Sequence, residues 1–186
     1  PLDHRRHCGL ILHIDDRKPG GVELAVVLSN RAGAPVLGAA SERDIPTEAV
    51  VRGDDESRRE HERRILDRLA DYGIDLICLD GYMRVLSSEF LEETPTTLNV
   101  HPSLLPAFPG MNAHEQVLES GVRTTGCTVH VVTEDVDGGP IVSQEAVPLS
   151  EDDTKEDLRE RVLQEAEHIA YPRALRWFAQ ERVEIN

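Results

Sequence analysis

Residues 99–110 read NVHPSLLPAFPG, and DVDGGP follows at residues 135–140. The first stretch starts as a strand and enters a proline-rich loop. It carries an amide, Asn99, and an imidazole, His101, at a spacing that puts both side chains on one face of a strand. Asp137 in the second stretch adds a carboxylate. Acyl transfer needs these groups: a donor to the oxyanion, a proton carrier, and a group that orients the carrier.

Each of these residues also has a purely structural explanation. Asn99 can satisfy loop backbone groups, His101 can cap the turn before Pro102, and Asp137-Gly138 is the commonest chemistry of a hairpin turn. The spacing of Asn99 and His101 alone favours the structural explanation. The two proline-bounded corners that follow favour a site, because a rigid loop fixes side-chain positions as catalysis requires.

Outward from this stretch, strand-like and helix-like segments alternate, which predicts an α/β fold with a Rossmann-like, mostly parallel twisted sheet flanked by helices. Predicted strands cover residues 22–28, 45–51, 74–79 and 97–100, and predicted helices cover 34–43, 57–72 and 113–119. Ser57 with Glu60 forms a capping box, Pro46 suggests an edge strand, and Gly73 and Gly121 end helices.

The last third of the chain predicts a different arrangement. Two β-rich runs, 127–133 and 140–147, flank the Asp-Gly-Gly turn and are expected to pair as an antiparallel C-terminal strand pair. Thr154 with Asp157 caps a final helix. Its apolar positions are Leu158, Val162, Ala166 and Ile169, and Pro172 is expected to break or kink it.

Composition limits the class of protein. Hydrophobic residues make up 39%, which suits a globular protein, and the net charge of −15 argues against nucleic acid as a partner. Only Lys18 and Lys155 are lysines, against 35 Asp and Glu. A lysine-poor, carboxylate-rich surface favours adaptation to high salt, and an acidic, arginine-rich proteome is the simpler alternative.

Other residue types point to a cytoplasmic protein without a metal. Cys8, Cys78 and Cys127 have neither metal-ligand nor disulfide spacing, so free thiols in a reducing cytoplasm are expected. The apolar runs are too short to span a membrane. His130 is expected to be a satisfied core or cleft histidine, and His61 a surface residue.

With these motifs in view, the sequence resembles the glycinamide ribonucleotide formyltransferases, folate-dependent enzymes of purine biosynthesis. NVHPSLLPAFPG matches that family's signature. GYMRVLS (81–87), GCTVHVVTEDVDGGPI (126–141) and EHIAYP (167–172) resemble its folate-binding and C-terminal motifs. The resemblance is dense over residues 74–172 and continues back to Val22. It implies the formyltransferase fold and transfer of the formyl group of 10-formyltetrahydrofolate, a co-substrate, to the amine of glycinamide ribonucleotide in IMP biosynthesis.

The resemblance also implies roles for individual residues. The implied catalytic residues are Asn99, His101 and Asp137. The implied folate-binding residues are Tyr82, Met83, Arg84, Val85, Leu86, Thr133, Glu134, Asp135 and Val136. Glu167 is expected to meet the glycinamide amine, and Arg58 matches a family arginine near the substrate. Only small-molecule partners are implied, with no metal, membrane or nucleic acid, and the oligomeric state is open between monomer and homodimer.

The beginning of the chain departs from the family pattern. Residues 1–21 show no clear strand and no glycine- and asparagine-rich loop to hold a phosphate, although GLILHIDDR resembles the remains of the following helix. We therefore expect an aberrant or truncated segment over 1–21 and a single formyltransferase domain over 22–186. Two other functions stay open: a formyltetrahydrofolate hydrolase, and a folate-binding protein without turnover.

Overall fold

The chain forms two compact units, Pro1–Leu98 and Asn99–Asn186. The structure is a computed structural model that describes residues 8–14, 22–82 and 84–180. The rest of the expected N-terminal segment, 1–7 and 15–21, lies outside the described residues. The single domain expected over 22–186 stays a prediction.

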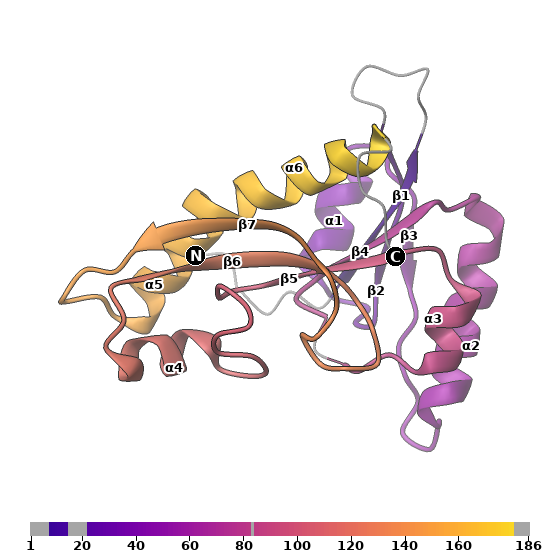
Figure 1. Cartoon of the computed structure of the whole chain (residues 1–186). Coiled ribbons are helices and arrows are strands. Elements are labelled where there is room, and N and C mark those ends of the chain that lie inside the picture. The colour runs from indigo at the N-terminus through magenta and orange to yellow at the C-terminus, as the bar shows by residue number, and fades with distance from the viewer. Residues whose placement is uncertain (1–7, 15–21, 83, 181–186) are drawn as a thin grey trace. The chain divides into compact units, whose positions relative to one another are not determined.

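Four strands form the sheet of the first unit, in the order β3-β2-β1-β4 (Figure 1). Their bounds are β1 Cys8–Ile14, β2 Val22–Ser29, β3 Thr47–Ala49 and β4 Leu76–Asp80. β2 and β3 are parallel. β3 ends the order, so the edge position expected from Pro46 is confirmed, although the strand is shorter than 45–51.

β1 corrects the expectation that no strand precedes Val22. It runs antiparallel to both β2 and β4, with Cys8 opposite Ser29 on one side and Asp80 on the other. The remnant helix expected over GLILHIDDR is also wrong for residues 9–14, which belong to this strand. The run CGLILHI has the length of a strand, and two neighbours satisfy its backbone hydrogen bonds, which a helix of that length would do poorly.

Three helices accompany this sheet: α1 Pro35–Ser41, α2 Arg58–Leu69 and α3 Ser88–Glu93. The capping box predicted for α2 is present, with Ser57 and Glu60 each accepting a hydrogen bond from the other's backbone N–H. A 3₁₀ turn, Ala70–Tyr72, follows α2 and ends at Gly73, which has a φ of 56°. The interior contains Val26, Val27, Leu28, Ile65, Leu69, Leu76, Ile77 and Leu79.

His61 is not the surface residue expected from the sequence. It is 1% exposed, and its Nε2 atom lies 2.7 Å from the carbonyl oxygen of Val50. The reason is its position one helical turn before Ile65 and two before Leu69, which places it on the buried face of α2.

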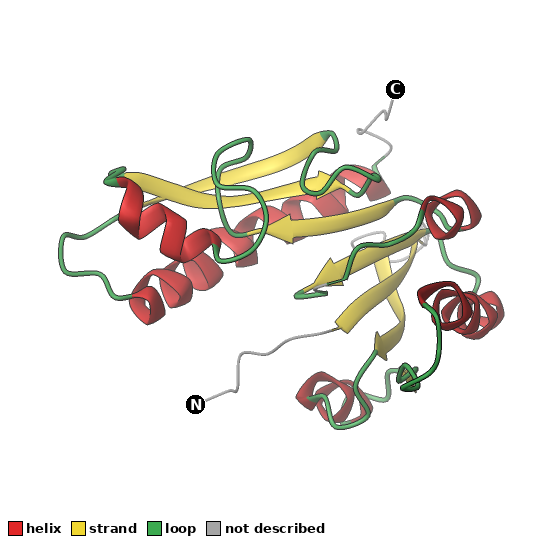
Figure 2. Cartoon of the chain, turned by 90° about the horizontal axis from the view of Figure 1, so that it is seen from below, coloured by secondary structure: helices red, strands yellow, loops and turns green. Residues whose placement is uncertain are grey.

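In the second unit, β6 (Thr124–Val131) and β7 (Ile141–Pro148) pair antiparallel, as predicted. Strand β5 (Thr97–His101) enters this unit at Asn99 and is the neighbour of β6 in the strand order. Helices α4 (Ala113–Ser120), α5 (Lys155–Val162) and α6 (His168–Ala179) complete the unit. Figures 1 and 2 show α5 and α6 running along the β6–β7 pair.

A π-helical segment, Leu163–Glu167, joins α5 to α6. Pro172 lies inside α6 and does not end it, so of the predicted break or kink the break is wrong and the kink stays a prediction. The π-helical segment ends at Glu167, five residues before this proline. The buried positions are Leu158, Val162, Ala166, Ala170 and Ala174. Ile169, expected on this face, is instead 47% exposed.

Candidate active site

Strand β5 ends at His101, and the following loop folds back over it. Ser103 donates a hydrogen bond through Oγ to the carbonyl oxygen of Ala107 at 2.5 Å. On β6, Thr128 donates to the carbonyl oxygen of Ser103 and accepts from the backbone N–H of Leu105. Gln144 on β7 donates to the carbonyl oxygen of Leu105. The antiparallel pair therefore fixes the loop that the prolines were expected to make rigid.

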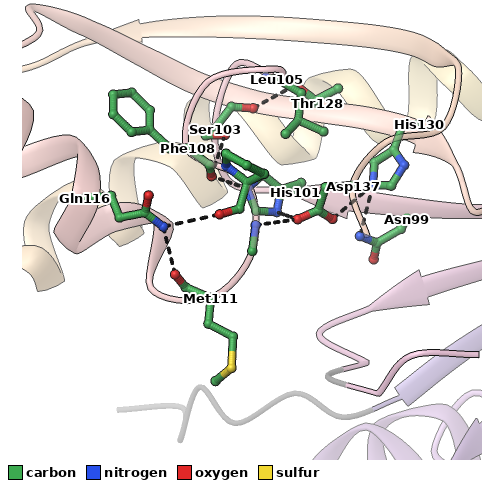
Figure 3. Close-up of polar contacts among 12 residues, drawn as sticks. Asn99, His101, Ser103, Leu105, Phe108, Met111, Gln116, Thr128, His130 and Asp137 are labelled. Atoms are coloured by element: carbon green, nitrogen blue, oxygen red, sulfur yellow. Dashed lines mark hydrogen bonds and ion pairs between the residues drawn. The ribbon is translucent and has the colours of Figure 1, made fainter. Parts of the chain in front are cut away.

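His101 bridges this loop and the loop between β6 and β7. It is 5% exposed. Its Nε2 atom lies 2.8 Å from the carbonyl oxygen of Phe108, and its Nδ1 atom lies 3.2 Å from Oδ2 of Asp137 (Figure 3). A carbonyl and a carboxylate are both acceptors, so the two contacts together fit an imidazolium that carries a proton on each nitrogen.

Asp137 is held in place by backbone as well as by side chains. Its Oδ2 atom accepts the N–H of Gly110 at 2.7 Å, and its φ of 54° lies in the left-handed region, which Asp tolerates better than most residues. Burial opposes ionisation of this carboxyl. Hydrogen bonds from His130 and Gly110 and the charges of His101 and His130 outweigh that effect, so the pKa of Asp137 is lowered.

The two glycines after Asp137 are required by close contacts. A Cβ atom on Gly139 would lie 1.9 Å from the carbonyl oxygen of Val131, and one on Gly138 would lie 2.8 Å from Cβ of Asp135. Gly138 also donates its backbone N–H to the carbonyl oxygen of Asp135. The Asp-Gly-Gly turn is therefore more than a link between strands, because its packing against β6 sets the position of Asp137.

His130 is the site residue that the sequence analysis missed. It is 2% exposed, and its Nε2 atom lies 3.3 Å from Nδ2 of Asn99 and 3.6 Å from Oδ1 of Asp137. Figure 3 shows Asp137 between the two imidazoles, with Asn99 beside His130. The sequence held part of a signal: His130 and Thr128 are two residues apart in a strand, so they share one face. Only the structure shows that this face meets the loop after β5.

The remaining residues of unit two expected at the site are more exposed. Thr133, Glu134, Asp135 and Val136 all lie on the exposed part of the loop between β6 and β7. Glu167, expected to meet the amine, is half-buried at the end of the π-helical segment. It is one of the groups that act on Cys127, whose thiol pKa is raised to about 12 by burial first and then by Glu167 and Glu145.

The first unit holds a cavity of about 420 Å³, a size typical of small-molecule sites. Tyr82, Arg84, Val85 and Arg58, all expected to bind substrate, line it. Its other walls come from Arg52, His61 and Glu62. Burial raises the pKa of the Tyr82 hydroxyl. Leu86 is buried, and Met83 lies outside the described residues.

Among the described residues, no group of three or more His, Cys, Asp or Glu side chains is arranged to hold a metal ion. No helix in the described part of the chain is long and apolar enough to cross a bilayer.

Comparison with known proteins gives the family. Residues 8–175 match the formyl transferase family model. The chain belongs to the formyl transferase family, and the formyltransferase fold expected from the sequence is confirmed. It is 38% identical to phosphoribosylglycinamide formyltransferase of Escherichia coli over 86% of this chain and 76% of that protein. The crystal structure of glycinamide ribonucleotide transformylase 1 from Symbiobacterium toebii superposes with a TM-score of 0.84 at 47% identity, covering 88% of this chain and 77% of that one.

A second group of relatives is much longer. The trifunctional purine biosynthetic protein adenosine-3 of Gallus gallus is 48% identical over 88% of this chain, which spans only 16% of that protein. The matched part of this chain therefore spans about a sixth of the length of that relative.

Proposed function

We propose that this chain transfers the formyl group of 10-formyltetrahydrofolate to the amine of glycinamide ribonucleotide. One observation supports this above all: Asp137 lies between His101 and His130, with the Asn99 amide beside them. These are the groups that an acyl transfer needs, and they occur in a chain related to enzymes named phosphoribosylglycinamide formyltransferase.

In the proposed reaction the amine nitrogen attacks the formyl carbon, and the carbonyl oxygen becomes an oxyanion. Nδ2 of Asn99 carries two hydrogens. One is directed at Nε2 of His130, which leaves the other to donate to the oxyanion. A single donor of this kind is typically worth about 10²–10³ in rate. The charge of a protonated His101 adds electrostatic stabilisation that Asn99 cannot provide.

Collapse of the intermediate breaks the bond between the formyl carbon and N10 of the folate. The amine must lose a proton, and N10 must gain one. The pair formed by His101 and Asp137 is suited to this exchange, because its carboxylate accepts a proton while its imidazolium supplies one. The low pKa of Asp137 keeps the carboxylate ionised at neutral pH.

Substrate binding is assigned by the chemistry of the side chains. Tyr82 and Val85 offer aromatic and apolar surface to the pterin, and Arg84 offers a cation to the folate carboxylates. Leu86, which is buried, is assigned to the same substrate on the resemblance alone. The loop residues Thr133, Glu134, Asp135 and Val136 are assigned to the same substrate. Glu167 and Arg58 are assigned to glycinamide ribonucleotide, with Glu167 binding its amine.

The expected setting of this activity is a reducing cytoplasm with high salt. Cys78 and Cys127 are buried, and the chain has 35 acidic residues against 20 basic ones, of which only two are lysines. Activity and folding should therefore be measured in molar KCl as well as in dilute buffer.

The experiment that tests the proposal compares two products from 10-formyltetrahydrofolate. Formylated glycinamide ribonucleotide that appears in step with tetrahydrofolate supports the transferase. Release of formate alone, whether or not the amine is present, would identify a hydrolase. Folate binding measured by calorimetry without any turnover would identify a binding protein. Asp137→Asn is the inactive control: it keeps the side-chain shape but removes the catalytic charge, so it should form little of either product.

A further inference from the structure

Glu62 is a buried carboxylate that the proposed reaction does not use. It lies on α2, is 4% exposed, and forms part of the cavity wall beside Tyr82 and Arg84. Both of its oxygens accept a hydrogen bond from Ser87: Oε1 from the backbone N–H at 3.1 Å, and Oε2 from the hydroxyl at 2.5 Å. A buried carboxylate with two donors from a single residue makes a specific, short-range anchor.

Ser87 is the residue that ends the cavity-lining segment and begins α3. Its Oγ atom accepts a hydrogen bond from the N–H of Phe90 at 3.2 Å. This bond makes Ser87 the N-cap of α3. The same hydroxyl donates to Glu62, so its donor and one acceptor position are both used. Leu86 and Ser87 are buried, while Arg84 and Val85 just before them are exposed on the cavity side.

The other end of this segment is fixed by the strand. β4 ends at Asp80, and Gly81 follows with a φ of 64°, a conformation that favours glycine. Tyr82, Arg84 and Val85 are therefore carried between a glycine turn and the Ser87 anchor. Arg58, a second cation of the cavity wall, lies one helical turn before Glu62, with its Nε atom 3.9 Å from Oε1.

We propose that Glu62 is the positioning residue of the folate subsite: through Ser87 it sets the segment that presents Tyr82, Arg84 and Val85, and through its charge it orients Arg58. The naming of the ligand as a folate rests on the proposed function, and the positioning itself does not. Loss of the anchor weakens folate binding and leaves the transfer step at saturation unchanged.

The test is folate affinity in the purified full chain, measured by calorimetry with tetrahydrofolate, which binds without reacting. Glu62→Gln keeps the shape but replaces one acceptor by an amide NH₂, so one of the two Ser87 bonds is lost. We expect the Kd to rise by about tenfold or more, equivalent to about 1.4 kcal/mol. The kcat at saturating donor should stay within about threefold of the parent.

The matched control is Glu93→Gln. Glu93 lies on α3 and pairs with Arg63 on α2, so this change removes the same charge between the same two helices, at an exposed position away from the cavity. Its Kd should stay within about twofold of the parent. Ser87→Thr, which keeps the hydroxyl and the N-cap, should retain affinity, while Ser87→Ala should lose it as Glu62→Gln does.

A Kd within twofold of the parent for Glu62→Gln, or a collapse of kcat with an unchanged Kd, would overturn the proposal. If Glu62→Gln does not fold, the Ser87→Ala and Ser87→Thr pair decides instead. If the parent chain binds no tetrahydrofolate, the proposed function fails. Hydrogen exchange at the amides of residues 84–88 then tests the anchor alone: Glu62→Gln should speed it and Glu93→Gln should not, and equal exchange would refute the positioning role.

Discussion

Asn99 and His130 form a side-chain pair in which the direction of donation follows the charge of the ring: a protonated His130 donates from Nε2 toward Asp137, and a neutral one accepts from Asn99. The Nδ1 atom of His130 lies 3.0 Å from the carbonyl oxygen of Val131, which only accepts, so this nitrogen carries a proton. In the neutral ring Nε2 is then the acceptor, and the Nδ2 atom of Asn99 donates to it across 3.3 Å. The amide nitrogen of Asn99 is thereby held on the His130 side, with its oxygen turned away.

The first prediction concerns His130. His130→Leu removes the acceptor, so the Asn99 amide is free to rotate and the oxyanion loses a fixed donor. We expect kcat to fall by about 10–100-fold with little change in KM for the formyl donor, since a single oxyanion donor is worth about 10²–10³. His130→Gln, whose oxygen can accept from Asn99, should lose less. Steady-state kinetics measure both, and His168→Gln on the exposed start of α6 is the control. Unchanged kcat in His130→Leu would show that Asn99 needs no partner.

The second prediction treats His101 and Asp137 as one unit. His101→Ala and Asp137→Ala should each remove most turnover and leave folate affinity largely intact, because their contacts are with each other, with His130 and with loop backbone. The double variant should lose little more than either single one, since residues that act together are strongly non-additive. Near-full kcat in Asp137→Ala would reduce Asp137 to a turn residue. Losses that multiply would mean two independent roles.

The third prediction uses the close approach at Gly139. A Cβ atom there would lie 1.9 Å from the carbonyl oxygen of Val131, which belongs to a strand and cannot move aside cheaply. Gly139→Ala should therefore displace the loop and with it Asp137, lowering kcat by at least about tenfold and the thermal midpoint by several degrees. Gly33→Ala is the control, because nothing lies within 4 Å of the position its Cβ would take. Parent-like activity in Gly139→Ala would show that the loop tolerates displacement.

The sequence predicted elements well where local signals and tertiary packing agree. Capping boxes at Ser57 and Thr154 both formed, because each satisfies backbone donors without help from the rest of the fold. The last helix shows the opposite case. The sequence places Ile169, three residues after Ala166, on the buried face, but the structure buries Ala170, four residues after it. The buried positions recur every four residues from Leu158 to Ala174, on both sides of the π-helical segment.

The candidate site shows a similar division. Asn99, His101 and Asp137 were expected because their residue types and the resemblance pointed to acyl transfer, and the structure brings all three into one network. His130 was missed because a lone histidine in an apolar strand is usually a core residue. The face of β6 that carries His130 becomes part of the site only because the loop after β5 folds back over it. Phe108 contacts His101 through its backbone carbonyl, and a pattern of side chains in the sequence cannot predict such a contact.

The final prediction concerns pH and His114, which lies on α4. Its Nδ1 atom is buried, and no described residue forms a hydrogen bond with it. Burial, followed by the charges of Arg159, Lys155 and His101, lowers its pKa from 6.5 to about 4. Below about pH 6.5 the unfolded chain binds a proton there that the folded chain refuses, so stability should fall as pH drops from 6.5 toward 4. By pH 5 the loss of unfolding free energy should reach about 2 kcal/mol relative to pH 7.

The variant His114→Gln should remove that part of the pH dependence of stability, and His168→Gln should not. Urea unfolding of the three proteins at pH 5 and pH 7, at one fixed salt concentration, measures the difference. Parallel pH dependences for the parent and His114→Gln would mean that His114 takes up its proton in the folded state.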